Sequence, residues 1–173
     1  MSLGVPKGRT FLVPHDPAWA ELFEEERRRL LGVLQPEVVE VQHIGSTAIP
    51  GIHAKPIIDI LVGTPSYVLA DDWQDRMASL GYDYPGDIGI PEHRVFGRDR
   101  EIRRFLVHVV DLHGLPWRRL VRFRNVLLRD PHLAVEYERL KLEAAAKYPI
   151  GLRSKYTDEK ADFIAEVLSR HPE

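Results

Sequence analysis

The 173-residue chain contains no cysteine and no long apolar run, and each absence excludes a class of protein. Without thiols it can form neither a disulfide nor a thiolate metal site, so a zinc site would need histidine and carboxylate ligands. The N-terminal residues lack the apolar core of a signal peptide, and no run approaches the roughly 20 apolar residues that cross a bilayer. We therefore expect a cytoplasmic protein with no membrane partner. Its 44% hydrophobic and 29% charged residues are typical of one globular domain over residues 1–173.

Acidic residues are scarce between Arg94 and Arg129, where ten arginines accompany only Asp99, Glu101 and Asp111. The whole chain has a net charge of −2, so this basic stretch lies within a mildly acidic protein. Such a stretch indicates a small anionic partner, a nucleotide or another phosphate-bearing molecule. Long nucleic acid usually binds a strongly basic domain and is not expected here. The alternative is a solvated arginine-rich hairpin and helix that bind nothing.

Apolar periodicity predicts an α/β (α+β) chain with a sheet at about residues 37–111 and helices at about 116–170. Four strands are expected at 38–43, 56–62, 94–98 and 102–110. A further short strand from Tyr82 would give a sheet of four or five strands. Helices are expected after the Asp16-Pro17 cap, over 65–80, over 116–129, from the Asp130-Pro131 cap to about 147, and over 158–170. Residues 149–155 resemble a linker.

The segment from His43 to Val62 carries the strongest functional signal. Gly45 and Ser46 form a turn after an apolar strand, and such a turn can present backbone N–H groups and a hydroxyl to a phosphate. Asp59 is the lone acid in the next, otherwise apolar strand, and a buried carboxylate must neutralise, pair or bind a cation. Twelve residues separate Ser46 from Asp59. The carboxylate could therefore hold a divalent cation beside a phosphate bound at the turn, as in metal-assisted nucleotidyl transfer.

This motif resembles that of the DNA polymerase beta-like nucleotidyltransferase superfamily. Residues 43–51 and 55–60 closely resemble the GrpB-like (glutamate-rich protein B) family, which belongs to that superfamily. The likeness extends over most of the chain, at residues 16–19, 80–82, 123–124, 128–129, 137–141, 156 and 160. It implies a nucleotidyltransferase-like mixed sheet of four or five strands flanked by helices, followed by C-terminal helices. It also implies nucleotidyl transfer that depends on a divalent metal.

Three positions depart from these patterns. Leu61 stands where the superfamily has a second carboxylate, Leu106 where the family tends to have a histidine, and Asn125 where it more often has an aspartate. If a divalent cation (Mg²⁺, Mn²⁺ or Zn²⁺) binds at Asp59, it must recruit another ligand. The candidates are His108, Asp111, His43 and His53. Asp59 and His108 could face each other across neighbouring strands, and such a mixed site suits Zn²⁺, Mn²⁺ or Fe²⁺ better than Mg²⁺.

The candidate site residues follow from these arguments. The catalytic candidates are Asp59, which would orient a metal on the α-phosphate, and Ser46, which would hold the terminal phosphates. The ligand-binding candidates are His43, Gly45, Ser46, Thr47, Lys55, Arg94, Arg98 and Arg104. The metal-binding candidates are Asp59 and His108. Strand alternation places Arg94 and Arg98 on one face, where they could hold a triphosphate.

Each candidate also has a purely structural interpretation. Asp59 could form a salt bridge with an arginine, and the arginines could protect an edge strand. His43 and Ser46 could simply stabilise the turn, and Lys55 could point to water. Because the second carboxylate is missing, the alternative to an enzyme is a catalytically silent module that binds a nucleotide or a coenzyme-A-like phosphate. GrpB-like domains occur fused to dephospho-coenzyme A kinase, which is consistent with that alternative.

Overall fold

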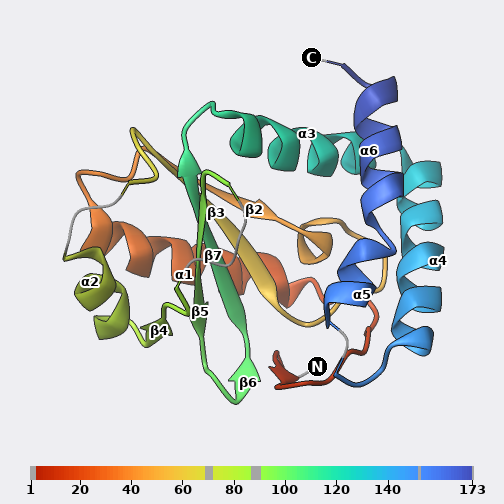
Figure 1. The fold of residues 1–173 in the computed structure, drawn as a ribbon, viewed down its shortest axis with the longest axis horizontal. Helices are drawn as coiled ribbons and strands as arrows, with labels where there is room; N and C mark the ends of the chain where they lie inside the picture. The colour runs from red at the N-terminus through yellow and green to blue at the C-terminus, as the bar shows by residue number, and fades with distance from the viewer. Residues whose placement is uncertain (1–2, 69–71, 87–90, 152, 173) are drawn as a thin grey trace.

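The computed structural model describes residues 3–68, 72–86, 91–151 and 153–172. Its centre is a five-stranded mixed sheet in the order β2-β3-β7-β5-β4 (Figure 1). The strands are β2 (Glu40–Ile44), β3 (Ile58–Thr64), β4 (Tyr82–Asp83), β5 (His93–Arg98) and β7 (Phe105–Asp111). β3 and β7 are parallel, and the other neighbouring pairs are antiparallel. The expected mixed sheet of four or five strands is therefore confirmed.

A small second sheet joins the N-terminal segment to the connection between β5 and β7. Its strands β1 (Val5–Pro6) and β6 (Ile102–Arg103) are antiparallel. The Gly4 amide also donates to the Pro56 carbonyl at 2.7 Å. The first residues of the described chain therefore lie near the start of β3.

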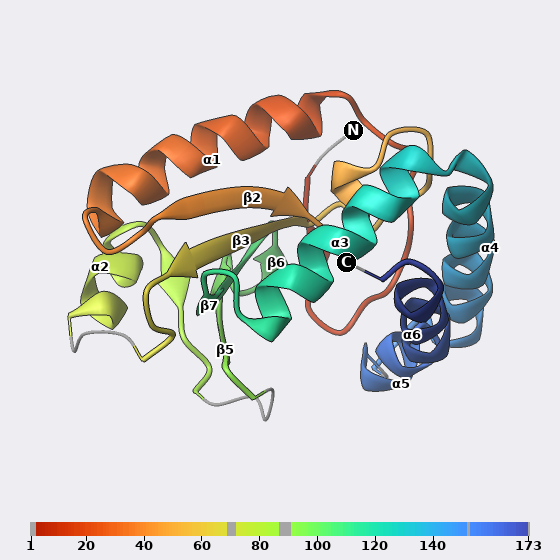
Figure 2. The ribbon, with the colours of Figure 1, turned by 90° about the horizontal axis from the view of Figure 1, so that it is seen from above.

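Helix α1 (Ala18–Leu34) covers one face of the main sheet (Figure 2). It begins where the sequence predicts, because the Asp16 carboxylate accepts a hydrogen bond from the Ala18 amide at 3.0 Å. Its buried residues, Phe23 and Leu30 among them, recur at helical spacing and pack against the apolar side chains of β3 and β7. The principal core therefore lies between α1 and the sheet.

Helix α3 (Leu115–Arg129) lies on the opposite face of the sheet from α1 (Figure 2). Three further helices pack beside the end of the sheet: α4 (Pro131–Lys147), α5 (Arg153–Asp158) and α6 (Ala161–Arg170). The expected C-terminal helices are thus confirmed. In the part of the chain that the structure describes, no helix combines the length and apolarity that a membrane span requires.

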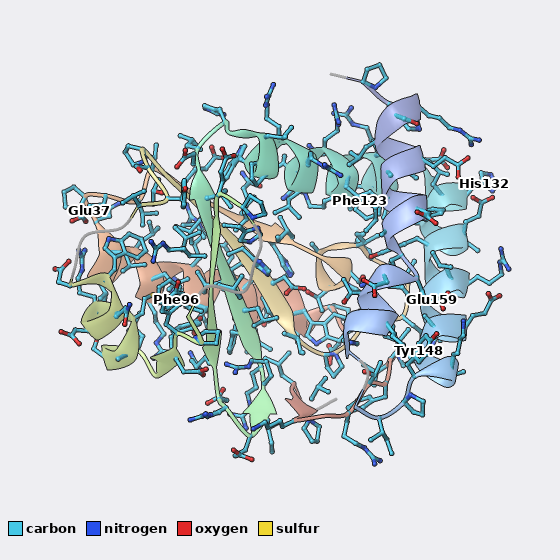
Figure 3. The ribbon with its side chains drawn as sticks, viewed as in Figure 1. Glu37, Phe96, Phe123, His132, Tyr148 and Glu159 are labelled. Atoms are coloured by element: carbon cyan, nitrogen blue, oxygen red, sulfur yellow. The ribbon has the colours of Figure 1, made fainter. Side chains whose placement is uncertain are left out.

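Aromatic and polar contacts hold the C-terminal helices together. The Tyr137 ring meets Phe123 edge-on at 5.2 Å and stacks on Phe163 at 5.6 Å between ring centroids. Phe123 projects from α3 where that helix meets α6 (Figure 3). At the other end of the helical layer, Tyr148 Oη donates to Glu159 Oε1 at 3.1 Å. The helices therefore form a second, smaller core beside the sheet.

Two expected helices are wrong in their bounds. Instead of a helix over 65–80, the structure has only α2 (Trp73–Ser79), and Val68 is 64% exposed. Residues before α2 are bound elsewhere, because the Tyr67 amide donates to the Asp111 carboxylate at the end of β7. Residues 69–71 of the expected helix lie outside the described residues.

The helix expected over 158–170 begins three residues later, as α6, and a separate short helix, α5, precedes it. The Lys160 amide donates to the Thr157 carbonyl at 3.2 Å, and this turn separates the two helices. The expected linker over 149–155 therefore contains the first turn of α5. Tyr156 within α5 is buried, with 3% of its surface exposed.

The cap of α4 gives a first prediction. The Asp130 carboxylate accepts hydrogen bonds from the amides of His132 and Leu133 at 3.0 and 3.2 Å. Asp130→Ala should lower the free energy of unfolding by about 1 kcal/mol, since a helix loses its N-terminal acceptor. Glu136→Ala, which removes an exposed acid from the same helix, is the matched control and should change stability little. Denaturant unfolding measures both, and equal losses in the two variants would contradict the role of the cap.

Candidate functional site

The turn after β2 and the single acid of β3 are neighbours in the sheet. Ile44 lies opposite Asp59 in the antiparallel pair, so the residue after Ile44 comes next to the carboxylate. Gly45 adopts φ +74°, and a Cβ atom there would lie 2.4 Å from Asp59 Oδ2. Glycine alone accommodates both the backbone conformation and the close approach. Ser46 then begins the short 3-10 helix η1 (Ser46–Ala48).

A cavity of about 170 Å³ lies beside this turn, and we call it the Asp59 cavity. Its polar lining includes Ser46, Thr47, Lys55, Asp59, His108, Thr157 and Lys160. The Tyr156 ring completes one wall: Lys55 Nζ lies 3.7 Å from its centroid and Lys160 Nζ lies 4.5 Å from it. One aromatic ring thus positions two ammonium groups beside one carboxylate. Burial raises the pKa of the Tyr156 hydroxyl, so the ring is neutral at neutral pH.

His43, a ligand-binding candidate, does not line the cavity and instead supports the turn. Its ring stacks on Phe23 at 4.7 Å, and its Nε2 lies 3.0 Å from Thr47 Oγ1. Thr47 Oγ1 in turn donates to the Ile57 carbonyl at 3.4 Å, so it accepts the proton of His43 Nε2. Burial lowers the pKa of His43 to about 4, although the nearby Asp59 charge opposes this shift. The imidazole is therefore neutral and holds η1 against β3.

Asp59 and His108 are the groups at this site that could hold a metal. His108 Nε2 lies 3.4 Å from Asp59 Oδ1, and His93 Nε2 lies 2.9 Å from His108 Nδ1. Burial, with the nearby His108 as a lesser cause, lowers the pKa of His93 to about 4. Among the described residues, no group of three or more histidine and acidic side chains is arranged to hold a metal ion. A cation here would have two protein ligands and would take its others from water or a bound molecule.

Helix α4 packs behind the turn with two buried polar groups. Burial raises the pKa of Tyr137 to about 12, and a hydrogen bond with the Ser46 side chain partly offsets this rise. Lys141 is 1% exposed, and its Nζ donates to the His53 carbonyl at 2.5 Å. Burial lowers the pKa of Lys141 to about 7, and the positive charge of Lys160 lowers it further. The hydroxyl of Ser46 is thus positioned from the helical layer as well as from the sheet.

Comparison with known proteins establishes the family. A family model described as GrpB protein matches residues 9–170. The chain belongs to the GrpB family. It is 38% identical over 172 residues to the glutamate-rich protein GrpB of Alkalihalophilus pseudofirmus, covering 96% of this chain and 98% of that protein. A crystal structure of the conserved protein GrpB from Enterococcus faecalis is similar with a TM-score of 0.84 and 33% identity, covering 92% of this chain and 96% of that one.

Other relatives of this GrpB family member are longer than it. The UPF0157 protein YqkA of Bacillus subtilis is 35% identical over 159 residues, covering 92% of this chain and 46% of YqkA, so the chain spans about half of that protein. A dephospho-CoA kinase of Mycolicibacterium paratuberculosis is 35% identical over 74 residues, covering 41% of this chain and 18% of the kinase. The mixed five-stranded sheet flanked by helices, with further helices at the C-terminal end, is the architecture expected from the sequence, and the GrpB structure from Enterococcus faecalis shares this fold.

The second carboxylate for which the resemblance gave a position is absent, because residue 61 is leucine. Leu61 is 0% exposed and packs with Ile44, Val110 and Trp117. The position two residues after Asp59 is therefore part of the core under α3. The structure thus explains physically why an acid at Leu61 would be costly here.

The structure does not bring Arg94 and Arg98 to the Asp59 cavity. They share one face of β5, as expected, but Phe96 between them belongs to the core under α1. Val95, on the other face, lies opposite His108. Because successive side chains of a strand point to opposite faces, Arg94 and Arg98 lie on the far side of the sheet from Asp59.

These arginines and Arg104 have other partners. Arg98 forms an ion pair with Glu26, which is 2% exposed on α1. Arg94 Nε donates to the Tyr67 carbonyl at 3.1 Å. Arg104 Nη1 lies 3.7 Å from an Asp99 carboxylate oxygen, outside the cavity lining. The expected triphosphate clamp is therefore not formed by these side chains.

Sequence reasoning missed the contribution of α5 to the cavity. Tyr156 and Thr157 of α5 line it, as does Lys160 in the turn that follows α5. The available signal was the spacing of Tyr156 and Lys160, since residues four apart in a helical segment lie on one face. Of the lysine and arginine side chains expected at the site, only Lys55 lines the cavity, and Lys160 supplies a second ammonium group there.

Proposed function

We propose that this protein binds a nucleotide or a related phosphate-bearing small molecule in the Asp59 cavity. The observation that carries the proposal is the meeting of Ser46, Lys55 and Lys160 in one cavity. The two ammonium groups supply the positive charge that a phosphate requires, and the Ser46 hydroxyl supplies a donor in a turn where glycine permits close approach. Three other cavities, which adjoin α3 and α6, the N-terminal segment and Glu26, contain neither Ser46 nor Asp59 in their linings.

A divalent cation would allow the Asp59 carboxylate and a bound phosphate to occupy the same cavity. A carboxylate and a phosphate in one small cavity repel each other, and a cation between them turns that repulsion into attraction. Asp59 and His108 would be its two protein ligands, and this oxygen and nitrogen pair suits Mn²⁺ or Zn²⁺. With only two protein ligands, the cation would arrive together with the phosphate-bearing molecule.

Binding without turnover is the better supported form of this function. Metal-assisted nucleotidyl transfer in the superfamily uses a second carboxylate. In this chain the corresponding residue is Leu61, which is buried in a hydrophobic cluster. A coenzyme-A-like ligand is the second candidate. The match to dephospho-CoA kinases favours it, because those proteins act on a phosphate-bearing coenzyme.

Thermal unfolding with added nucleotides tests the proposal. We expect at least one of ATP, GTP, CTP, UTP or coenzyme A, with Mg²⁺, Mn²⁺ or Zn²⁺, to raise the unfolding temperature. A ligand at a hundredfold excess over its dissociation constant adds about 2.7 kcal/mol of stability. Asp59→Asn should remove the dependence on the metal, and Lys55→Gln should weaken binding at least tenfold, because each removes a charge from the cavity. Asp75→Asn, at an exposed site on α2, is the control and should bind as the unaltered protein does.

The outcomes separate the alternatives. A shift in unfolding temperature without pyrophosphate release supports the binding module. Pyrophosphate release that disappears in Asp59→Asn would instead identify a nucleotidyltransferase. The absence of a shift with every ligand and metal would overturn the proposed function.

A further inference from the structure

A larger basic groove adjoins the Asp59 cavity near the pairing of β1 with β6. This N-terminal groove has a volume of about 440 Å³, and its charged lining is Lys7, Arg9, Lys55, Asp83, Arg100 and Arg103. Lys55 and Ile57 line both spaces, so the groove and the cavity meet at these two side chains. Five cations and one acid in the lining make the groove strongly positive.

The fold fixes the position of the groove's cations. The Lys7 amide donates to the Glu101 carbonyl at 2.9 Å, which ties the N-terminal segment to the β5–β7 connection. Arg103 pairs with Asp83 at 2.9 Å and lies across Gly97, where a Cβ atom would come within 1.8 Å of its guanidinium. Gly97 is therefore what allows this arginine to lie flat against β5 and line the groove.

Three of the cations in the N-terminal groove have no acidic partner. Lys7, Arg9 and Arg100 are exposed, and within the described residues none of them forms an ion pair. Like charges held close together repel, so the groove favours an anion that would relieve the repulsion. The charge alone would suit many anions. Because the groove adjoins the Asp59 cavity, the anion of interest is a second group of the molecule that binds there.

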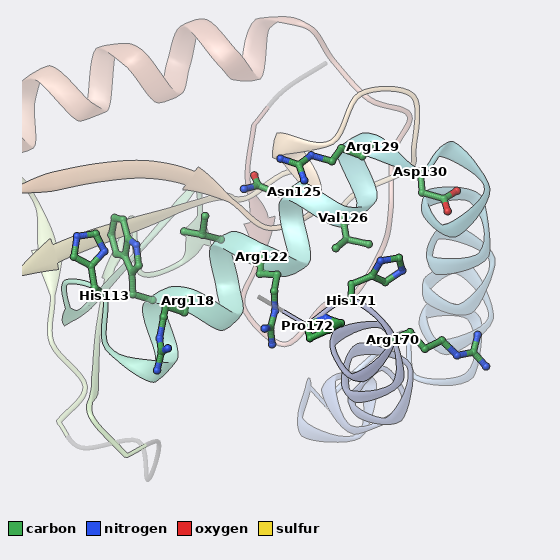
Figure 4. A pocket seen from close by; sticks show the side chains of 12 residues that line it. His113, Arg118, Arg122, Asn125, Val126, Arg129, Asp130, Arg170, His171 and Pro172 are labelled. Carbon is green, nitrogen blue, oxygen red and sulfur yellow. The ribbon is translucent and has the colours of Figure 1, made fainter.

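Another basic groove, between α3 and α6, provides the contrast (Figure 4). It has a volume of about 680 Å³ and contains Arg118, Arg122, Arg129 and Arg170. In this groove Arg170 pairs with Glu166 at 2.5 Å, and Arg118 and Arg122 have interactions of their own. It shares no lining residue with the Asp59 cavity. It therefore serves as the control surface for the N-terminal groove.

The two volumes suit a single ligand that extends from the cavity into the groove. Sites for drug-sized molecules usually have volumes of about 300–1,000 Å³, and the Asp59 cavity of about 170 Å³ has room for little more than a phosphate group and a cation. The N-terminal groove of about 440 Å³ can hold the remainder of a molecule whose first phosphate lies at Ser46.

We propose that the ligand is a polyphosphorylated small molecule, with one phosphate in the Asp59 cavity, a second anionic group in the N-terminal groove, and Lys55 between them. This inference rests on the proposed function, which assigns the first phosphate to the cavity. Lys7, Arg9 and Arg100 are then specificity residues, because they select ligands with more than one phosphate over those with one.

Inorganic phosphate and tripolyphosphate, titrated by calorimetry at one fixed Mg²⁺ concentration, test the inference on the full chain. We expect tripolyphosphate to bind at least tenfold more tightly than phosphate. Combined substitution of Lys7, Arg9 and Arg100 by glutamine should abolish this preference and leave phosphate binding unchanged. Combined substitution of Arg118, Arg119 and Arg129 by glutamine removes the same charge from exposed positions on α3 and should preserve the preference. Thermal unfolding confirms that both triple variants are folded.

The outcomes distinguish this inference from the proposed function. If Lys55→Gln weakens phosphate binding but the Lys7, Arg9 and Arg100 variant keeps the tripolyphosphate preference, the cavity stands and the inference is overturned. If both triple variants lose the preference equally, the effect is one of net charge and the inference is again overturned. If neither probe binds to the unaltered protein, the inference and the assignment of a phosphate to the cavity are both overturned.

Discussion

Replacing Gly45 with alanine is expected to lower the free energy of unfolding by about 3 kcal/mol and to abolish phosphate binding. Gly45 has φ +74° and ψ −176°, a combination that residues with a side chain rarely adopt. The added Cβ would lie 2.4 Å from Asp59 Oδ2 and 3.1 Å from Asp59 Cβ, so the carboxylate must move away. The substitution therefore strains the turn and displaces the one acid of the cavity together.

Gly51→Ala separates the two effects of Gly45→Ala. Gly51 also has a positive φ, +83°, but a Cβ atom there would have no neighbour within 4 Å. We expect it to cost only the backbone strain, about 1 kcal/mol, and to leave ligand binding unchanged. Denaturant unfolding and calorimetric titration measure both variants. If Gly45→Ala and Gly51→Ala lose the same stability and both still bind phosphate, the close approach of Gly45 to Asp59 does not contribute to binding.

The second large effect is a pH dependence of stability that originates at Lys141. Its folded-state pKa is about 7, and its ordinary value is 10.5, because burial disfavours the ammonium form. Between these pH values the unfolded chain binds the proton and the folded chain does not, so the unfolding free energy rises with pH across this window. The contribution is about 1.4 kcal/mol per pH unit and stops growing above the unfolded pKa.

Lys141→Met should remove this slope, because the buried position then carries no titratable group. Unfolding in denaturant at a series of pH values from 7 to 9.5 gives the slope as the difference between the two proteins. Lys147→Met is the control: hydrogen bonding to Glu159 raises the pKa of Lys147, so its titration lies above this window. Parallel pH curves for the unaltered protein and Lys141→Met would refute the assignment of the slope to Lys141.

The fold was predictable from the sequence where local signals and burial agree. Asp16-Pro17 and Asp130-Pro131 each begin a helix because a carboxylate accepts the first amide hydrogens, and those bonds form in the structure. The lone acid of β3 and the glycine before Ser46 also meet as predicted, because the β2–β3 register leaves no other place for them. These are features that a few neighbouring residues determine.

The failures share a physical cause, which is that partners distant in sequence decide them. Arg94 and Arg98 lie on one face as alternation requires, but alternation does not say which face. The face is determined by Phe96, which packs under α1, and by buried Glu26, which pairs with Arg98. Glu26 could have been noticed, since it lies three residues after Phe23 and four before Leu30, on the buried stripe of α1.

The contribution of α5 could not be placed from the sequence for a similar reason. Tyr156 lies in α5 and Lys160 in the turn after it, and the approach of Lys55 and Lys160 to the Tyr156 ring depends on how α4 to α6 pack against the sheet. The packing of Tyr137 between Phe123 and Phe163 sets that arrangement. A lysine pair around one tyrosine ring is thus a product of tertiary structure.

The most direct measurement is a crystal structure of the protein soaked in tungstate, a phosphate mimic that scatters X-rays anomalously. We expect an anomalous peak in the Asp59 cavity, within hydrogen-bonding distance of Ser46 Oγ and Lys55 Nζ. The same peak should be absent from crystals of Lys55→Gln. A peak confined to the groove between α3 and α6, with no tungstate beside Ser46, would contradict this expectation.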